Sequence, residues 1–182
     1  MEEIKYRIAI VGTSGSGKST LAREVSEIVG CPHIEMDNHS FLPRWQKKED
    51  HIFVEHIEKL LEQKNWVSCG NYSIVRDSVW KRATHLVWIN LPFWKVFWQV
   101  LVRTFKRILT REEIAGGNFE TIKRQFFSRQ SIFLWVITTH KRRSRVYSKL
   151  IEERAYPNLK VSILTSNKKI KEWLNQLKKG EI

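Results

Sequence analysis

A run of glycine and serine residues followed by lysine has the residue types and spacing of a phosphate-binding loop. Residues 12–19 read GTSGSGKS and satisfy the pattern G-x-x-x-x-G-K-[ST] in full. Glycine adopts the tight backbone angles that turn successive amides toward phosphate oxygens. The lysine places a charge on the β- and γ-phosphates, and the final serine hydroxyl suits Mg²⁺. We predict that this loop binds ATP or another nucleoside triphosphate, through Gly12, Thr13, Ser14, Gly15, Ser16, Gly17, Lys18, Ser19 and Thr20.

The carboxylate of Asp37 is the second group that could do chemistry. It follows the segment HIEM at 33–36, which we predict to be a strand that ends beside the phosphate loop. A carboxylate there can hold Mg²⁺, together with Ser19, or orient and deprotonate an acceptor hydroxyl. The alternative is an aspartate that caps a turn with its own side chain.

Three side chains after the predicted strand 66–69 are candidates for substrate binding. Asn71 and Tyr72 follow the strand directly, and Arg76 lies one helical turn further on. An arginine pairs bidentately with carboxylate or phosphate, although a surface arginine without a fixed partner fits this position equally well. Trp45, in the loop after Asp37, could stack on a base or ring.

The charge of the chain is concentrated between residues 103 and 145. The net charge is +13, and this segment alone holds eleven Lys or Arg and three glutamates. Arg103 and Arg107 share a helix face, and Arg142 and Arg143 follow a glycine pair at 116–117. An arginine-bearing helix, a glycine hinge and an arginine-bearing return predict a lid over residues 103–145 that closes on phosphates. Nucleic acid, an anionic lipid surface or a solvated basic face are the other interpretations of such a segment.

Alternating strands and helices must position these residues. We expect strands at 6–11, 33–36, 66–69, 84–90 and 159–164, which form an α/β fold with one parallel sheet covered on both faces. The chain length favours a single domain over residues 1–182. The segment 92–109 is apolar on most sides and predicts a largely buried helix, and a long helix is expected over 119–153. The chain has eight tryptophans, at 45, 66, 80, 88, 94, 98, 135 and 173. All except Trp45 are expected to pack in the core.

Composition narrows the class of protein. Cys31 and Cys69 are far apart, without a redox or metal-binding spacing, and are expected as small buried residues in a reducing compartment. Met1-Glu2-Glu3 does not have the pattern of a secretory signal, and the apolar stretch 86–102 is interrupted and too short to cross a bilayer. The six histidines lack the spacing of metal ligands. These features favour a cytoplasmic protein.

The motifs together resemble one family over nearly the whole chain. The phosphate loop, Asp37, the loop FLPRW at 41–45, the segment WVSCGNY at 66–72 and the paired arginines are similar to the bacterial DNA topology modulation group of P-loop proteins, relatives of adenylate and shikimate kinases. The resemblance implies a five-stranded sheet in the order 2-3-1-4-5 and a kinase-like site. The phosphate loop is specific to the superfamily, whereas Gly70-Asn71-Tyr72 indicates this group.

The resemblance also implies roles for single residues. By similarity to adenylate kinases, Arg103 would lie against the adenine, the turn at Ser166 would back the base, and Arg107, Arg142 and Arg143 would touch phosphates. By similarity to shikimate kinases, Glu35 and Asp37 form an Asp-x-Asp-like pair for metal and acceptor. The chain departs from the group at Cys69, where an aspartate is usual. A thiol is not a ligand that Mg²⁺ prefers.

Three functions are compatible with these residues. The first is an ATP-dependent kinase acting on a nucleotide or another small metabolite, with Lys18, Asp37, Arg107, Arg142 and Arg143 in catalysis. The second is a nucleotide-dependent protein that binds nucleic acid, which rests on the basic segment and on the name of the group. The sequence disfavours it mildly, because the basic residues coincide with the lid, which must be basic in any case. The third is a regulatory switch with weak ATPase activity, because Cys69 replaces the expected acid.

Overall fold

The computed structural model describes residues 6–128 and 131–182. Met1-Glu2-Glu3 and Arg129, one of the basic residues of the segment 103–145, lie outside the described residues. The elements in chain order are β1 (Arg7–Gly12), α1 (Lys18–Val29), β2 (His33–Glu35), α2 (Met36–Ser40), η1 (Pro43–Trp45), α3 (Asp50–Leu60), β3 (Trp66–Cys69), η2 (Ser73–Val75), α4 (Arg76–Arg82), β4 (His85–Ile89), α5 (Phe93–Thr110), β5 (Glu113–Ile114), β6 (Asn118–Phe119), α6 (Ile122–Phe127), α7 (Ile132–Glu152), β7 (Lys160–Leu164) and α8 (Asn167–Lys179).

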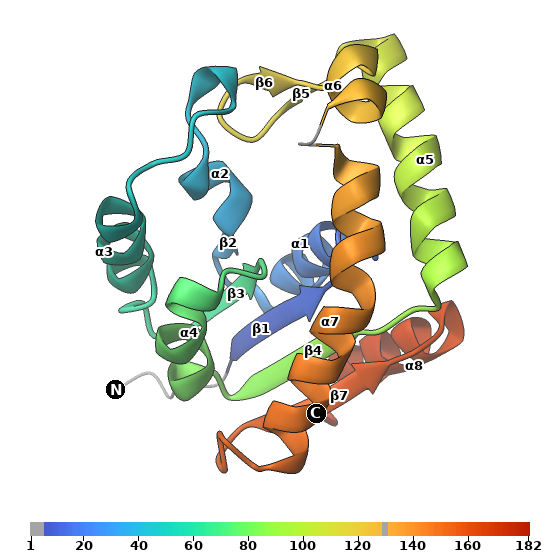
Figure 1. Ribbon diagram of the computed structural model, residues 1–182. Coiled ribbons are helices and arrows are strands. Elements are labelled where there is room, and N and C mark those ends of the chain that lie inside the picture. The colour runs from blue at the N-terminus through green and yellow to red at the C-terminus, as the bar shows by residue number, and fades with distance from the viewer. Residues whose placement is uncertain (1–5, 129–130) are drawn as a thin grey trace.

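Five strands form one parallel sheet in the order β2-β3-β1-β4-β7. Because β5 and β6 form a separate antiparallel hairpin, β7 is the fifth strand of the main sheet. The predicted α/β class and the order 2-3-1-4-5 are therefore confirmed. Figure 1 shows the carboxyl ends of β1, β3 and β4 directed toward the space below the hairpin and between α2 and α5.

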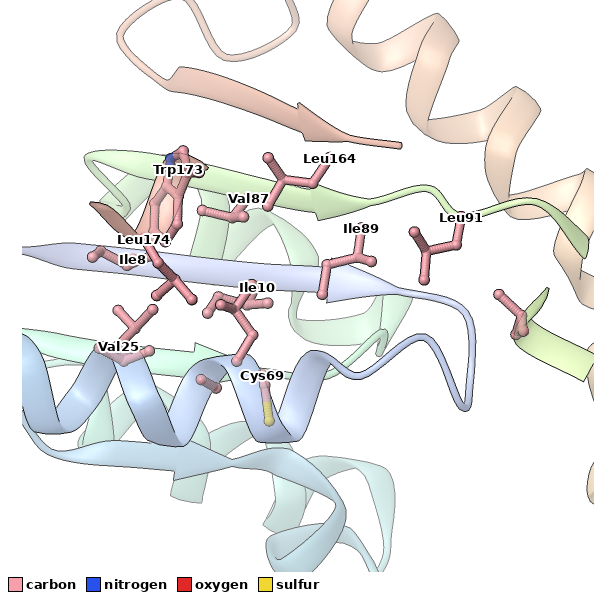
Figure 2. Packing of buried hydrophobic residues seen from close by; sticks show 14 of the residues in the cluster. Ile8, Ile10, Val25, Cys69, Val87, Ile89, Leu91, Leu164, Trp173 and Leu174 are labelled. Carbon is pink, nitrogen blue, oxygen red and sulfur yellow. The ribbon is translucent and has the colours of Figure 1, made fainter. Parts of the chain in front are cut away.

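The alternation of side chains along β1 divides the core into two clusters, one on each face of the sheet. Ile8 and Ile10 pack with residues of α1 and α8, whereas Ala9 and Val11 pack with residues of α3 and α4. Figure 2 shows the first cluster between the sheet and α1, with Trp173 and Leu174 of α8 at its far end. Every strand residue of β3 and β4 is buried, as expected for a sheet that is covered on both faces.

The second strand ends earlier than the sequence predicts. β2 stops at Glu35, and Met36 begins the short helix α2, which places Asp37 in the first turn of that helix. Met36 is buried and packs in the cluster on the α3 side of the sheet. Ile34 and Met36 are both buried, but burial alone does not distinguish a strand from the start of a helix.

The expected long helix over 119–153 is wrong. The segment contains β6, α6 and α7, and each helix starts at its own side-chain cap. Thr121 accepts a hydrogen bond from the Arg124 amide, and Ser131 accepts from the amides of Phe133 and Leu134. Ser and Thr are preferred caps because their oxygens satisfy amides that have no partner inside the helix. Helical periodicity without proline therefore did not guarantee one continuous helix.

The expected burial of the helix at 92–109 is also wrong. Only one side of α5 is buried, at Val96, Val100 and Thr104. The opposite side leaves large apolar side chains exposed, including Trp94 and Trp98. Of the eight tryptophans, four are buried (Trp66, Trp80, Trp88 and Trp173) and three are exposed (Trp94, Trp98 and Trp135). Apolar periodicity predicted the helix correctly, but whether a second layer covers its outer side is a property of the tertiary structure.

Candidate active site

The phosphate loop connects β1 to α1 and is held from below by Asn71. The Asn71 side chain accepts a hydrogen bond from the Gly12 amide at 3.2 Å and donates one to the Gly12 carbonyl oxygen at 2.5 Å. Tyr147 of α7 donates its hydroxyl to the same Asn71 oxygen at 3.2 Å. The amide of Asn71 is thus committed to fixing the start of the loop. The sequence predicts that Asn71 binds substrate, but the structure places it under the loop.

The other side of the loop is covered by α5. A Cβ on Gly15 would lie 2.1 Å from Cγ2 of Val100, so only a glycine allows this contact. Gly15 also has φ +81°, and the following Gly17, the N-cap of α1, has φ +92°. These left-handed angles turn the loop amides inward at the positive end of the α1 dipole. The contact with Val100 fixes α5 directly against the phosphate loop.

Three cations from three different elements meet at the loop. Lys18 begins α1 and is buried, while Arg103 of α5 and Arg143 of α7 are each partly buried. Burial lowers the pKa of Lys18, and the positive charges of Arg103 and Arg143 lower it further. The pKa of Arg103 and that of Arg143 are also lowered, in both cases mainly by burial. A buried lysine and two partly buried arginines in one place repel each other and lose hydration, so their clustering indicates an anion-binding site.

Several buried polar atoms have no hydrogen-bond partner among residues 6–128 and 131–182. They include Ser16 Oγ of the loop and one guanidinium nitrogen from each of the two arginines whose charges act on Lys18, Arg103 Nε and Arg143 Nη1. Gln99 Oε1 and Thr104 Oγ1 of α5 are also buried without a partner. Buried polar groups are nearly always paired, so each unpaired one needs an explanation. For the two guanidinium groups a bound phosphate supplies it, because phosphate oxygens accept charge-assisted hydrogen bonds.

Asp37 lies near the cations and is oriented by Tyr72. The Tyr72 hydroxyl donates to Asp37 Oδ1 at 2.7 Å, and Phe53 packs against the Tyr72 ring. Burial, together with the charge of Asp37, raises the pKa of Tyr72, so the phenol stays protonated and keeps donating. The charge of Asp37 also acts on Lys18, Arg103 and Arg143. The structure therefore brings together five of the predicted residues: Lys18, Asp37, Tyr72, Arg103 and Arg143.

Cys69 lies beside the residue that is predicted to bind magnesium. Its thiol donates a long hydrogen bond of 3.8 Å to the Ser19 hydroxyl, and His33 Nε2 lies 3.3 Å from the sulfur. Burial and the charge of Glu35 raise the pKa of Cys69 to about 12. The group is therefore a neutral thiol near pH 7. Both cysteines are free and buried, as expected from the sequence.

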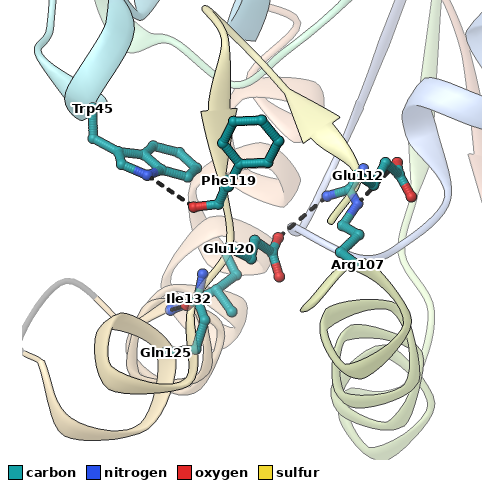
Figure 3. A network of polar contacts seen from close by, with 7 residues as sticks. All are labelled: Trp45, Arg107, Glu112, Phe119, Glu120, Gln125 and Ile132. Carbon is teal, nitrogen blue, oxygen red and sulfur yellow. Dashed lines mark hydrogen bonds and ion pairs between the residues drawn. The ribbon is translucent and has the colours of Figure 1, made fainter. Parts of the chain in front are cut away.

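The predicted lid residue Arg107 is bound to two glutamates (Figure 3). Its guanidinium pairs with Glu112 at 3.2 Å and with the buried carboxylate of Glu120 at 3.3 Å. Glu120 follows the β5–β6 hairpin, so this ion pair ties the hairpin to the end of α5. The described contacts of Arg107 are with the hairpin, and its predicted contact with phosphate would need an exchange of partners.

Trp45 contacts the hairpin instead of an open substrate site. Its indole donates to the Phe119 carbonyl at 3.3 Å, as Figure 3 shows, and its backbone amide donates to the Asn118 side chain at 2.6 Å. The Arg124 guanidinium lies 4.3 Å from the ring centroid. Trp45 lines an open hollow of about 610 Å³ together with Arg44, Lys123 and residues of the hairpin. The predicted stacking on a base stays a prediction.

The remaining predicted residues lie away from the loop or have other contacts. Arg142 is exposed on α7. Arg76 lies over the rings of Trp80 and Tyr147, about 6 Å from each centroid. Ser166 caps α8 by accepting from the Lys169 amide at 3.2 Å. Their predicted roles in phosphate, acceptor and base binding stay predictions.

Sequence reasoning missed Tyr147 and two unpaired polar residues of α5. Tyr147 reaches Asn71 from the distant helix α7, and nothing in its sequence context signals this contact. Gln99 and Thr104 interrupt the apolar pattern of α5, and both have unpaired buried oxygens. A polar residue on the buried side of an apolar helix was a signal that could have identified them.

Solved structures that resemble this chain include a gluconokinase and two shikimate kinases. A gluconokinase from Sinorhizobium meliloti 1021 aligns with a TM-score of 0.54 and 16% identity, over 98% of this chain and 97% of that chain. A shikimate kinase from Bacteroides thetaiotaomicron aligns with a TM-score of 0.53 and 17% identity, over 96% of each chain. A shikimate kinase from Acinetobacter baumannii, in complex with shikimate, gives 0.53 and 15%, over 93% and 89%.

At these identities the likeness is one of fold. No protein-family model matches the chain, and no curated protein matches its sequence. Within residues 6–128 and 131–182, no helix is both long enough and apolar enough to cross a bilayer. The fold, the sheet order and the position of the phosphate loop agree with the same conclusion: this chain has the P-loop kinase fold.

Proposed function

We propose that the protein is an ATP-dependent kinase that transfers the γ-phosphoryl group to a hydroxyl of a small molecule. The observation that carries the proposal is the meeting of Lys18, Arg103 and Arg143 at the phosphate loop, with guanidinium donors that have no partner in the protein. Phosphoryl transfer depends mainly on positioning and on stabilising charge that spreads over the γ-phosphoryl oxygens. Preorganised cations at the loop supply that stabilisation.

Asp37 is the proposed acceptor-side residue. Tyr72 fixes one carboxylate oxygen, which leaves the group oriented toward the cation cluster to accept a hydrogen bond from the substrate hydroxyl and then its proton. The acceptor is a nucleotide or another metabolite, and the choice between ATP and GTP is part of the test below.

The oxygen donors at the site fit Mg²⁺. Magnesium is usually held by one or two carboxylates and the substrate phosphates, with water in the other positions. The Ser19 hydroxyl and the Asp37 carboxylate would hold the ion, and it would neutralise charge on the β- and γ-phosphates. The neutral thiol of Cys69 does not fit as a ligand, so the second acidic residue is missing on that side.

The test is phosphoryl transfer in the presence of ATP or GTP, Mg²⁺ and a panel of hydroxylated metabolites, read as ADP or GDP release. We expect Lys18→Ala to lower turnover by about a hundredfold or more, since a single preorganised donor contributes this much. The matched control is Lys81→Ala, which removes an exposed lysine in a surface ion pair. Background release with every acceptor, unchanged in Lys18→Ala, would disprove the proposal.

A second pair of variants separates the acceptor role from nucleotide binding. We expect Asp37→Asn to abolish acceptor phosphorylation while ATP still raises the melting temperature. Asp77 provides the control, because it also accepts a hydrogen bond from a tyrosine, Tyr156, but lies on the surface. Asp77→Asn should keep full activity. Equal losses in both variants would contradict the assignment of Asp37.

Two finer assignments remain proposals. Membership of the DNA topology modulation group rests on the segment Gly70-Asn71-Tyr72 and on the paired arginines. A nucleotide-binding switch with slow hydrolysis is the second candidate function, and the neutral thiol at Cys69 is the observation that favours it.

A further inference from the structure

The outer side of α5 carries a continuous stripe of exposed apolar side chains. Its members are spaced by three or four residues and so share one face of the helix. The exposed fractions are 76% for Trp94, 65% for Trp98, 53% for Val102, 46% for Phe105 and 82% for Leu109. We call these five residues the α5 stripe. Scattered apolar residues are normal on a surface, but a contiguous row of this size marks an interaction site.

The stripe faces away from the nucleotide site. Val100 and Arg103 of the same helix are directed toward the phosphate loop, whereas Trp98 and Val102 lie on the opposite side. Figure 1 shows α5 along the right-hand edge of the molecule, with no other element outside it. Closing the predicted lid over the phosphates would therefore leave the stripe uncovered.

The charge around the stripe selects the occupant. Of the basic residues of α5, Arg103 faces the phosphate loop and Arg107 pairs with Glu112 and Glu120, which leaves Lys95 and Lys106 for the stripe. Lys95 and Lys106 follow the stripe along one border in the helical repeat, and Lys106 is exposed. A second copy of the chain would present the same positive face and be repelled. A partner surface that has an apolar interior beneath a negatively charged layer is complementary to the stripe and its bordering lysines.

We propose that α5 docks the protein on an anionic lipid surface. A helix with Trp, Phe and Leu on one face and lysines at its border lies in the headgroup region, with the apolar side chains in the acyl boundary. Tryptophan suits this depth because its ring is apolar and its N–H remains near water. The stripe extends over about 22 Å at 1.5 Å per residue, which is enough for all five side chains to enter together.

The geometry allows lipid and nucleotide to bind at the same time, because they occupy opposite sides of α5. Docking would present the phosphate loop away from the bilayer. The proposal does not depend on the kinase reaction, and it holds equally for a nucleotide-binding switch.

The test is cosedimentation with vesicles of phosphatidylcholine alone and of phosphatidylcholine mixed with phosphatidylserine. We expect binding to the anionic vesicles only, with a blue shift of tryptophan emission. The double variant Trp98→Ser/Leu109→Ser should lower the partition coefficient at least about tenfold, because two large apolar side chains no longer leave water. Lys95→Gln and Lys106→Gln should each lower it about fivefold, the equivalent of about 1 kcal/mol per cation.

The matched control is Ile52→Ser/Ile74→Ser, which removes two apolar side chains of 47% and 46% exposure outside the stripe. This variant should bind vesicles as the unmodified protein does. Because all four positions are exposed, each variant is expected to fold, and ATP-dependent stabilisation of the double variant checks this independently. If ATP does not stabilise the unmodified protein, this result would refute the nucleotide site but not the proposed lipid-binding surface.

Three results would overturn the proposal. One is the absence of binding to anionic vesicles. Another is a dimer that the stripe variant converts to monomer without any vesicle binding, which would make a second copy the occupant. The third is a protein that binds duplex DNA but not vesicles, with DNA binding unchanged in the stripe variant. The basic residues would then be assigned to nucleic-acid binding.

Discussion

The sheet with its flanking helices and the α5–α7 region (residues 93–152) differ in how they bury apolar side chains. In the sheet, all residues of β3 and β4 are buried, and the side chains of β1 alternate between two closed clusters. The α5–α7 region instead contains twelve of the seventeen large apolar side chains that are exposed among the described residues. Apolar side chains therefore form the closed core in the sheet region, whereas in the α5–α7 region many of them lie at the surface.

The cations of the α5–α7 region also differ from one another. Some have carboxylate partners among the described residues and some do not. Arg107 pairs with Glu112 and Glu120, whereas Arg103, one helical turn earlier, has a buried guanidinium nitrogen without a partner. The paired arginine holds the hairpin, and the unpaired one faces the phosphate loop. We interpret Arg107 as a structural residue and Arg103 as an anion-binding residue.

The largest expected effect comes from substituting each of these two arginines in turn. Arg107→Met should lower the free energy of unfolding by about 3 kcal/mol, because the buried Glu120 carboxylate loses its partner. Arg103→Met should leave that free energy unchanged or raise it, because a desolvated cation is removed. It should also weaken ATP binding at least about tenfold. Urea denaturation and nucleotide titration measure both quantities, and destabilisation of equal size in both variants would break the comparison.

A smaller effect tests the contact between the two regions. Gly15→Ala would bring a Cβ to 2.1 Å from Val100, whereas Gly17→Ala meets nothing within 4 Å. Both positions have positive φ, so the strain of a non-glycine residue is similar in the two variants. We expect Gly15→Ala to cost about 1–3 kcal/mol more in unfolding free energy.

The control for this contact is a second substitution in α5. Val100→Ala in the Gly15→Ala background should recover part of the lost stability, because it removes the methyl group that a Cβ would meet. If Gly15→Ala and Gly17→Ala are equally stable in denaturation experiments, α5 does not press on the loop in solution.

The smallest expected effect concerns the thiol beside Ser19. Cys69→Asp should raise ATP hydrolysis about tenfold, since it restores a carboxylate next to the predicted magnesium ligand. Cys69→Ser keeps the size and lacks the charge, so it should hydrolyse ATP as the unmodified protein does. A Cys69→Asp rate that does not differ from the serine variant would indicate that Asp37 already holds the ion.

The two regions also differ in what could be predicted from the sequence. The positions of the five strands and of the last helix at 167–179 were predicted from local patterns, with β2 one residue too long, and the sheet order was predicted from the family resemblance. The hairpin at Glu113–Phe119 was missed, and α6 and α7 were merged into one helix. Strands of two residues are too short for a pattern to show.

By itself, the sequence determined the phosphate loop, because the backbone angles of glycine and the charge of Lys18 are local properties. It also determined that α5 is a helix. Only the tertiary structure decided that Asn71 holds the loop in place, that Arg107 binds Glu120, and that one side of α5 faces outward. The physical reason is that a side chain's partner depends on which distant element reaches it. Local chemistry shows what a residue can bind, and packing decides what it contacts.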